Sequence, residues 1–157
     1  MKDRDVSDLG AYIEEVRQRT ASDFAALALP LPGGGRYSWQ YASGNLNMRY
    51  RQMLVRRGKG LPGRALLLDR LVVWDGNGDA GEGHLGDSPI VLAERLLAAA
   101  ALPLPLVADR RAVLLAGLRT PGCELTAWLL ELAVQADRLT ARLGALEAIE
   151  PRTGERA

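Results

Sequence analysis

A glycine-rich turn at residues 58–63 constrains the fold of this chain more than any other short segment. Glycine stands at positions 58, 60 and 63, and an apolar run follows through residue 68. Glycine adopts a positive φ at little steric cost, and Pro62 suits the first turn of a helix, where its missing N–H would have no partner. The segment predicts a tight connection from a strand into a helix, and such a helix start can hold a small anion.

Short apolar runs on both sides of this turn predict an antiparallel sheet. Tyr37, Trp39 and Tyr41 alternate with polar residues just after a run that ends in two prolines and three glycines, which is typical of a β-hairpin. Pro103 and Pro105 in a later run predict that part of that strand lies at a sheet edge or carries a bulge. The strands are expected at residues 24–29, 37–41, 50–57, 71–74, 99–107 and 112–118.

Apolar residues spaced three and four apart predict helices at both ends of the chain. The helices are expected at residues 6–20, 61–68, 89–97 and 124–146. Consecutive hairpins with terminal helices favour an α+β domain, in which an antiparallel sheet is covered on one face by those two helices.

The length of 157 residues fits one domain, expected at residues 1–150 and followed by a disordered polar tail at 151–157. The formal net charge is +1, which gives no argument for nucleic-acid binding. A single cysteine excludes an internal disulfide, and no run is long and apolar enough to cross a membrane. A cytoplasmic protein without a membrane partner is expected.

The order of elements and the glycine turn resemble a GAF domain over roughly residues 7–143. More narrowly, residues 39–45, Arg49, Tyr50 and the glycine turn resemble the single-domain GAF nitrate receptors that act beside an oxygen-sensing histidine kinase in bacteria. The resemblance implies a sheet of five to six strands, with the terminal helices on one face and a ligand pocket on the other.

The same resemblance implies a nitrate site made of backbone amides and walled by a tryptophan. The tryptophan corresponds to Trp39, one helix start to Leu61 and Pro62, and a second helix start to Ser88, Pro89 and Ile90. Pro62 stands where an amide donor is expected and has none to give, and Ser88 stands where the family has a tyrosine. Nitrate is a planar monoanion that amide donors and helix dipoles can satisfy, so no cofactor and no metal are expected.

These features favour a cytoplasmic small-anion sensor, not an enzyme, that modulates a sensor histidine kinase in a two-component system of nitrate assimilation or respiration. Binding would order residues 75–90 and change a surface that the kinase contacts. The alternative is an interaction or dimerisation module with a vestigial or differently specific pocket. In that case a heptad in residues 125–146 forms a homodimer or kinase contact, which charge at Leu132 or Leu139 would disrupt.

Three other chemistries have weaker support in the sequence. Some GAF proteins reduce free methionine sulfoxide, but this chain has only Cys123 for a reaction that generally needs a second thiol. Residues 75–86 begin like a calcium loop but have Ala80 and Gly86 where glycine and glutamate are required, and His84 lacks a second ligand. Residues 36–70 carry eight basic residues against Asp69 alone, a cluster that leaves docking of an acidic protein open.

Overall fold

The computed structural model describes residues 2–76, 85–120 and 124–149. The helices and strands follow in the order α1 (Lys2–Arg19), β1 (Phe24–Pro30), β2 (Arg36–Ser43), η1 (Arg49–Gln52), β3 (Leu54–Arg56), α2 (Gly60–Leu68), β4 (Val72–Asp75), α3 (Pro89–Ala93), β5 (Ala98–Pro105), η3 (Val107–Asp109), β6 (Arg111–Leu118) and α4 (Leu125–Ile149).

Six strands form one antiparallel sheet in the order β3-β2-β1-β6-β5-β4. Both predicted hairpins are present, as β1–β2 and as β5–β6. β4 pairs with β5 only as far as Ala101, so Pro103 and Pro105 lie where β5 pairs with β6 alone. The prediction that these prolines mark an edge is therefore correct.

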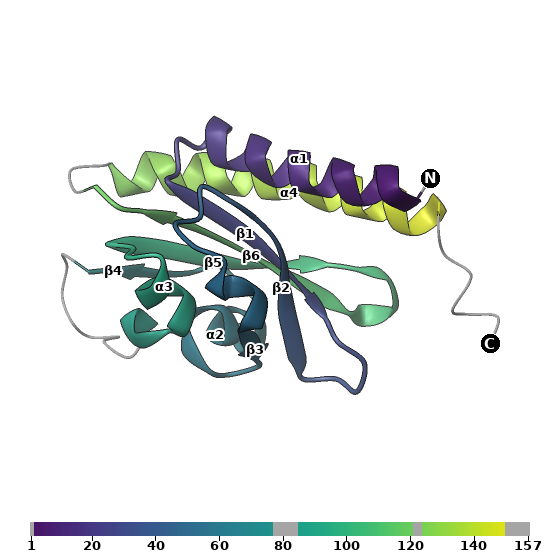
Figure 1. Cartoon of the computed structure of the whole chain (residues 1–157), viewed down its shortest axis with the longest axis horizontal. Coiled ribbons are helices and arrows are strands. Elements are labelled where there is room, and N and C mark those ends of the chain that lie inside the picture. Colours follow the sequence, from purple (N-terminus) through teal and green to yellow (C-terminus); the bar gives the residue numbers. More distant parts are fainter. Residues whose placement is uncertain (1, 77–84, 121–123, 150–157) are drawn as a thin grey trace.

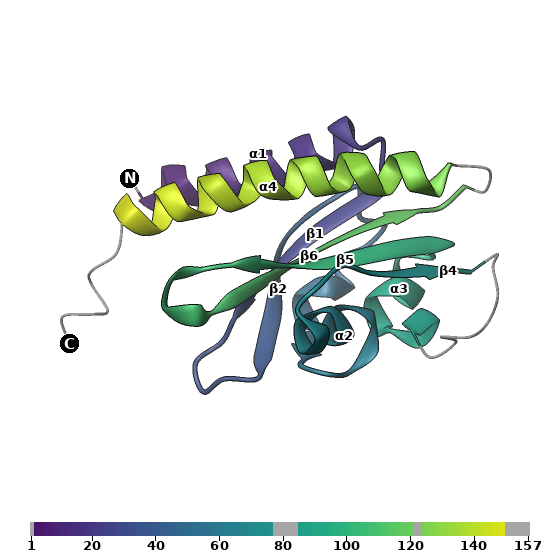
Figure 2. The same cartoon turned by 180° about the vertical axis from the view of Figure 1, so that it is seen from behind.

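The two faces of the sheet carry different helices. Figures 1 and 2 show α1 and α4 side by side over one face, and α2 and α3 on the opposite face. The heptad of α4 packs into the first of these layers, where Leu132 and Leu139 are buried with Ile13 of α1 and Leu114 of β6. The predicted α+β class, the six-stranded sheet and the terminal helices on one face are confirmed.

Several predicted elements have different bounds in the structure, and two of these differences affect the pocket face. The third strand was expected over residues 50–57, but η1 occupies Arg49–Gln52 and β3 contains only Leu54–Arg56. The helix expected at 89–97 ends at Ala93, because the chain turns there and Ala98 begins β5. In both places a buried side chain lies at the change: Tyr50 belongs to the short 3-10 helix η1, and Glu94 directly follows α3.

Some sequence predictions fall outside the described residues. Cys123, His84, most of the calcium-like segment and the tail at 151–157 belong to this group. Within residues 2–76, 85–120 and 124–149, no helix has the length and apolar character needed to span a membrane.

Candidate functional site

A pocket of about 400 Å³ opens between β2, the end of β3 and the starts of α2 and α3. We call it the anion pocket. Its lining residues are Trp39, Met53, Leu54, Val55, Arg56, Lys59, Gly60, Pro62, Asp87, Ser88, Pro89 and Ile90. Five of the six site residues predicted from sequence are among them, and the sixth, Leu61, is wholly buried behind the wall. The structure thus brings together residues from widely separated parts of the chain.

The glycine turn places the start of α2 against the start of α3. Gly60 has φ +68°, and a Cβ at this position would stand 2.8 Å from the Ser88 hydroxyl. Gly63 has a different reason to be glycine, since its Cβ would meet the Arg56 carbonyl oxygen at 2.1 Å. The turn therefore makes the close approach predicted from the sequence. The groups that it approaches are Ser88 and Arg56 of the same chain.

Ser88 bridges the two helix starts. Its buried hydroxyl accepts a hydrogen bond from the Leu61 N–H at 2.7 Å and donates one to the Leu85 carbonyl at 2.7 Å. The Leu61 amide, which the sequence predicted as a donor to the anion, is therefore already satisfied within the protein. Pro62 beside it has no N–H, so two consecutive positions of the α2 start offer the pocket no free donor.

The pocket still offers amides and positive charge. Gly60 and Ile90 lie in the first turns of α2 and α3, where backbone N–H groups have no acceptor within their own helix. Arg56 and Lys59 line the pocket with Asp87 as the opposing charge. Two cations against one carboxylate leave a local charge of +1, which suits a monoanion.

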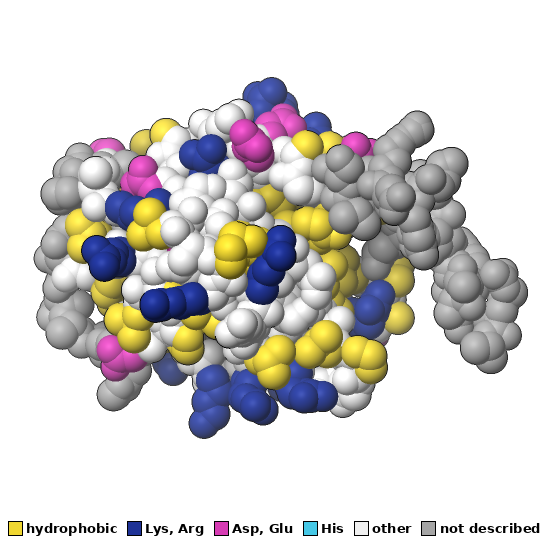
Figure 3. Space-filling view, viewed as in Figure 1, with side chains coloured by type: hydrophobic (Ala, Val, Ile, Leu, Met, Phe, Trp, Pro, Cys, Tyr) yellow, Lys and Arg dark blue, Asp and Glu magenta, His cyan; other side chains and the backbone are white. Residues whose placement is uncertain are grey.

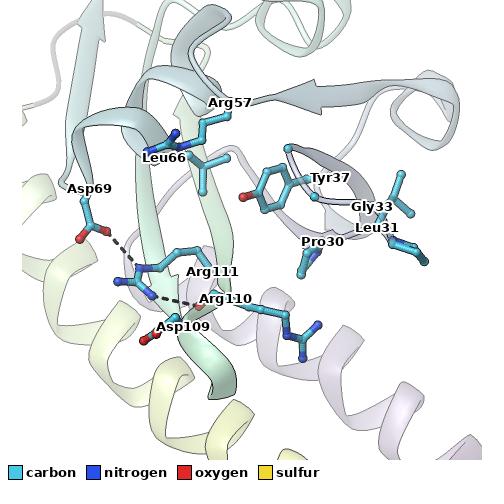
Figure 4. A pocket seen from close by; sticks show the side chains of 13 residues that line it. Pro30, Leu31, Gly33, Tyr37, Arg57, Leu66, Asp69, Asp109, Arg110 and Arg111 are labelled. Carbon is cyan, nitrogen blue, oxygen red and sulfur yellow. Dashed lines mark hydrogen bonds and ion pairs between the residues drawn. The ribbon is translucent and has the colours of Figure 1, made fainter. Parts of the chain in front are cut away.

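A larger hollow of about 660 Å³ lies at the opposite end of α2, and we call it the distal pocket (Figure 4). Its lining residues are Pro30, Leu31, Pro32, Gly33, Gly34, Gly35, Tyr37, Arg57, Leu66, Asp69, Asp109, Arg110 and Arg111. None of the site residues predicted from sequence lies there. The larger volume alone does not make it the better match for nitrate, which needs a small site.

Known proteins of similar structure place this fold in a family. No protein-family model and no curated protein sequence matches the chain. A structure of NreA from Staphylococcus aureus, mutated in its nitrate binding site, is 32% identical, with a TM-score of 0.63, over 76% of this chain and 86% of that one. The chain belongs to the NreA family of GAF proteins.

More distant structures show the same GAF fold around other functions. The GAF domain of a two-component sensor histidine kinase from Bacillus halodurans is 12% identical, with a TM-score of 0.70, over 91% of this chain and 96% of that one. A free methionine-R-sulfoxide reductase from Neisseria meningitidis is 19% identical, with a TM-score of 0.67, over 88% of this chain and 77% of that one. At these identities the likeness extends to the fold alone.

In this NreA-family protein the end of α3 is fixed by a buried ion pair that sequence reasoning missed. The Glu94 side chain is 1% exposed, and Arg119 donates to its Oε1 at 2.7 Å. The backbone N–H of Leu46 donates to the same oxygen at 2.7 Å, while Arg119 Nε donates to the Glu94 carbonyl at 2.8 Å. Because these residues are far apart in sequence, no local pattern indicated that they would meet.

This GAF protein shows no metal cluster in the part of the chain that the structure describes. No group of three or more His, Cys, Asp or Glu side chains lies close enough there to hold a metal ion. The Glu94 carboxylate is paired with Arg119, and its second oxygen, Oε2, has no hydrogen-bond partner among the described residues.

Proposed function

We propose that this protein is a cytoplasmic receptor that binds the small monoanion nitrate in the anion pocket and modulates a sensor histidine kinase. The observation that carries the proposal is the convergence of Trp39 and the starts of α2 and α3 on one small pocket. The 32% identity to NreA, a protein described by its nitrate binding site, supports nitrate as the first ligand to test.

Nitrate would occupy the pocket as a planar acceptor without a covalent step. The first-turn amides of Gly60 and Ile90 would donate to its oxygens, and the positive ends of the two helices would favour its charge. The buried Trp39 ring would form a flat wall that excludes water. The protein would act by binding, not as an enzyme, and it would need no cofactor.

Signalling would follow from the contacts of α3. Its start belongs to the anion pocket, and its end is tied through Glu94 to Leu46 and Arg119. An anion that stabilises one position of α3 would shift the population of the surface formed by α3 and the loop before η1. A histidine kinase that contacts this surface would then respond to nitrate in assimilation or respiration.

Basic side chains support the approach of an anion. Figure 3 shows Lys and Arg side chains gathered along the edge of the molecule near α2 and β3. Arg56, Lys59 and Arg64 are exposed in this region. Such a local field raises the concentration of anions near the pocket, although the net charge of the chain is only +1.

Calorimetric titration of the ligand-free protein with nitrate, nitrite, chloride and iodide tests the proposal. We expect nitrate to release or absorb heat with a saturable curve and to raise the melting temperature. Trp39→Leu should weaken the binding while circular dichroism shows the fold retained. No heat and no thermal shift at millimolar nitrate would refute nitrate as the ligand.

A second candidate function is an interaction module whose pocket no longer binds nitrate. The Ser88 bridge favours it, because this hydroxyl already satisfies the Leu61 amide. This alternative predicts that a kinase complex forms equally well with and without anions. The sequence suggested a contact through Leu132 and Leu139. Both residues are buried against the sheet, so the contact would have to use another surface.

A further inference from the structure

The distal pocket has the composition of a ligand site that is separate from the anion pocket. Its volume of about 660 Å³ lies within the range of about 300 to 1,000 Å³ that is typical of small-molecule sites. Apolar side chains of Pro30, Leu31 and Leu66 form part of its wall. Figure 4 shows the Tyr37 ring beside them, with its hydroxyl directed into the hollow.

The charged groups of the distal pocket leave one guanidinium for a ligand. Arg111 Nε donates to Asp69 Oδ1 at 3.1 Å, and this bond, together with the charges of Asp69 and Asp109, raises the pKa of Arg111. Arg57, on the other side of the hollow, has no ion-pair partner within the residues that the structure describes. A guanidinium presents a planar fork of donors that matches a carboxylate.

The balance of charge favours a monoanion. Arg57, Arg110 and Arg111 contribute three positive charges to the lining, and Asp69 and Asp109 contribute two negative ones. A ligand with one negative charge would neutralise the remaining +1. A dianion such as phosphate would exceed this balance by one charge and would be repelled more strongly by the two carboxylates.

We propose that the distal pocket binds a small organic monocarboxylate. The ligand carboxylate pairs with Arg57, and its apolar body packs against Leu66 and the ring of Tyr37. This proposal concerns a separate site and stands whether or not the anion pocket binds nitrate.

The chain provides matched controls because neighbouring residues face the two pockets. Arg56 lines the anion pocket, whereas Arg57 lines the distal pocket. On β2, Trp39 lines the anion pocket and Tyr37 lines the distal pocket. The two ends of α2 also belong to different pockets, with Gly60 and Pro62 at one and Leu66 at the other. A change at one arginine therefore tests one pocket.

Calorimetric titration with benzoate tests the proposal, because benzoate combines a carboxylate with an apolar ring. We expect saturable binding that is tighter than that of acetate, benzyl alcohol or inorganic phosphate. Arg57→Ala should weaken benzoate binding about tenfold or more, since a hydrogen-bonded ion pair is lost. Arg56→Ala removes the same charge from the neighbouring position and should leave benzoate binding unchanged.

Several outcomes would overturn the proposal. Absence of benzoate binding, equal affinity of Arg57→Ala and wild type, or tighter binding of phosphate would each do so. An equal loss in Arg56→Ala would assign the binding to the general basic surface instead of the pocket. Arg57→Ala should bind nitrate as the wild type does, and circular dichroism should show its fold unchanged. A loss of benzoate binding in this variant then belongs to the distal pocket and not to a failure of the anion pocket.

Discussion

The two faces of the sheet are held together in different ways. Under α1 and α4 the packing is dominated by apolar side chains, with Ile13, Leu132 and Leu139 buried in one continuous layer. Both layers contain aromatic rings, and under α4 the buried Trp128 Nε1 donates to Ser22 Oγ at 2.9 Å. The layer under α2 and α3 differs in that its buried polar bridges, at Ser88 and at Glu94, fix the two ends of α3. Both pockets open on this second face.

Both faces stabilise the fold, but only the second also carries the pockets. Close apolar packing keeps the sheet rigid. Polar bridges are directional, so a ligand that offers better hydrogen bonds can replace them. Substitutions on the pocket face should therefore change ligand affinity as well as stability, and substitutions on the other face should change stability alone.

Loss of Arg119 should have the largest effect. Arg119→Met leaves the Glu94 carboxylate buried without its partner, and we expect the free energy of unfolding to fall by about 3 to 5 kcal/mol in urea denaturation. The double substitution Arg119→Met with Glu94→Leu removes both charges and should recover much of this loss. If the single substitution costs less than about 1 kcal/mol, the ion pair does not hold this face together.

Leu132→Ala examines the apolar face. This side chain is 0% exposed, and its truncation should lower the free energy of unfolding by about 2 to 5 kcal/mol through lost burial and a residual cavity. Nitrate affinity, measured where the variant is still folded, should not change. Leu130→Ala on the same helix removes a side chain that is 66% exposed and should cost less than about 0.5 kcal/mol. A change in affinity at Leu132 would show that the two faces are not separate.

Ser88→Ala examines the polar bridge directly. It frees the Leu61 N–H for the anion, so we expect nitrate affinity to rise by a factor corresponding to about 0.5 to 1.5 kcal/mol, together with a small loss of stability. Titration calorimetry measures the affinity. Ser38 and Trp39 are adjacent on β2, so their side chains lie on opposite faces of the sheet. Ser38→Ala therefore removes a hydroxyl away from the anion pocket and should leave nitrate affinity unaltered. Weaker binding in Ser88→Ala would mean that the anion uses the hydroxyl itself.

Glu15→Gln should have the smallest effect. Arg142 of α4, assisted by Arg19, holds the pKa of Glu15 below its ordinary value. Because that pKa is lowered on folding, the contribution is present at neutral pH and is lost as pH falls through the folded-state pKa. We expect the substitution to cost less than about 1 kcal/mol at pH 7 and nothing at a pH below that folded-state pKa, as measured by urea denaturation at each pH. A cost that persists at low pH would point to packing instead of charge.

Much of the fold could be predicted because its signals are local. The spacing of Leu132, Leu139 and their neighbours indicated α4, and the alternation around Trp39 indicated β2. The glycine turn was read correctly for the same reason, since positive φ at Gly60 and close approach at Gly63 are properties of short segments. The bounds of β3 and α3 were less accurate because tertiary contacts of Tyr50 and Glu94 decide them.

The candidate site was predictable in its members but not in its hydrogen bonds. The resemblance to GAF receptors brought Trp39, Leu61 and Ile90 together in advance, and in the structure Trp39 and Ile90 line one pocket while Leu61 lies buried behind its wall. The engagement of Leu61 by Ser88 crosses 27 positions of sequence and depends on atomic distances. The distal pocket was missed because its residues come from four separate segments, none of which has a recognisable motif.

The prolines of β5 have a further consequence at high protein concentration. Beyond Ala101 this strand has no neighbour on the β4 side, and an open strand edge is a template on which a second chain can add. Proline has no N–H to offer such a strand, so Pro103 and Pro105 interrupt the ladder where it is exposed. They protect the protein against edge-to-edge aggregation at the point where its own sheet is incomplete.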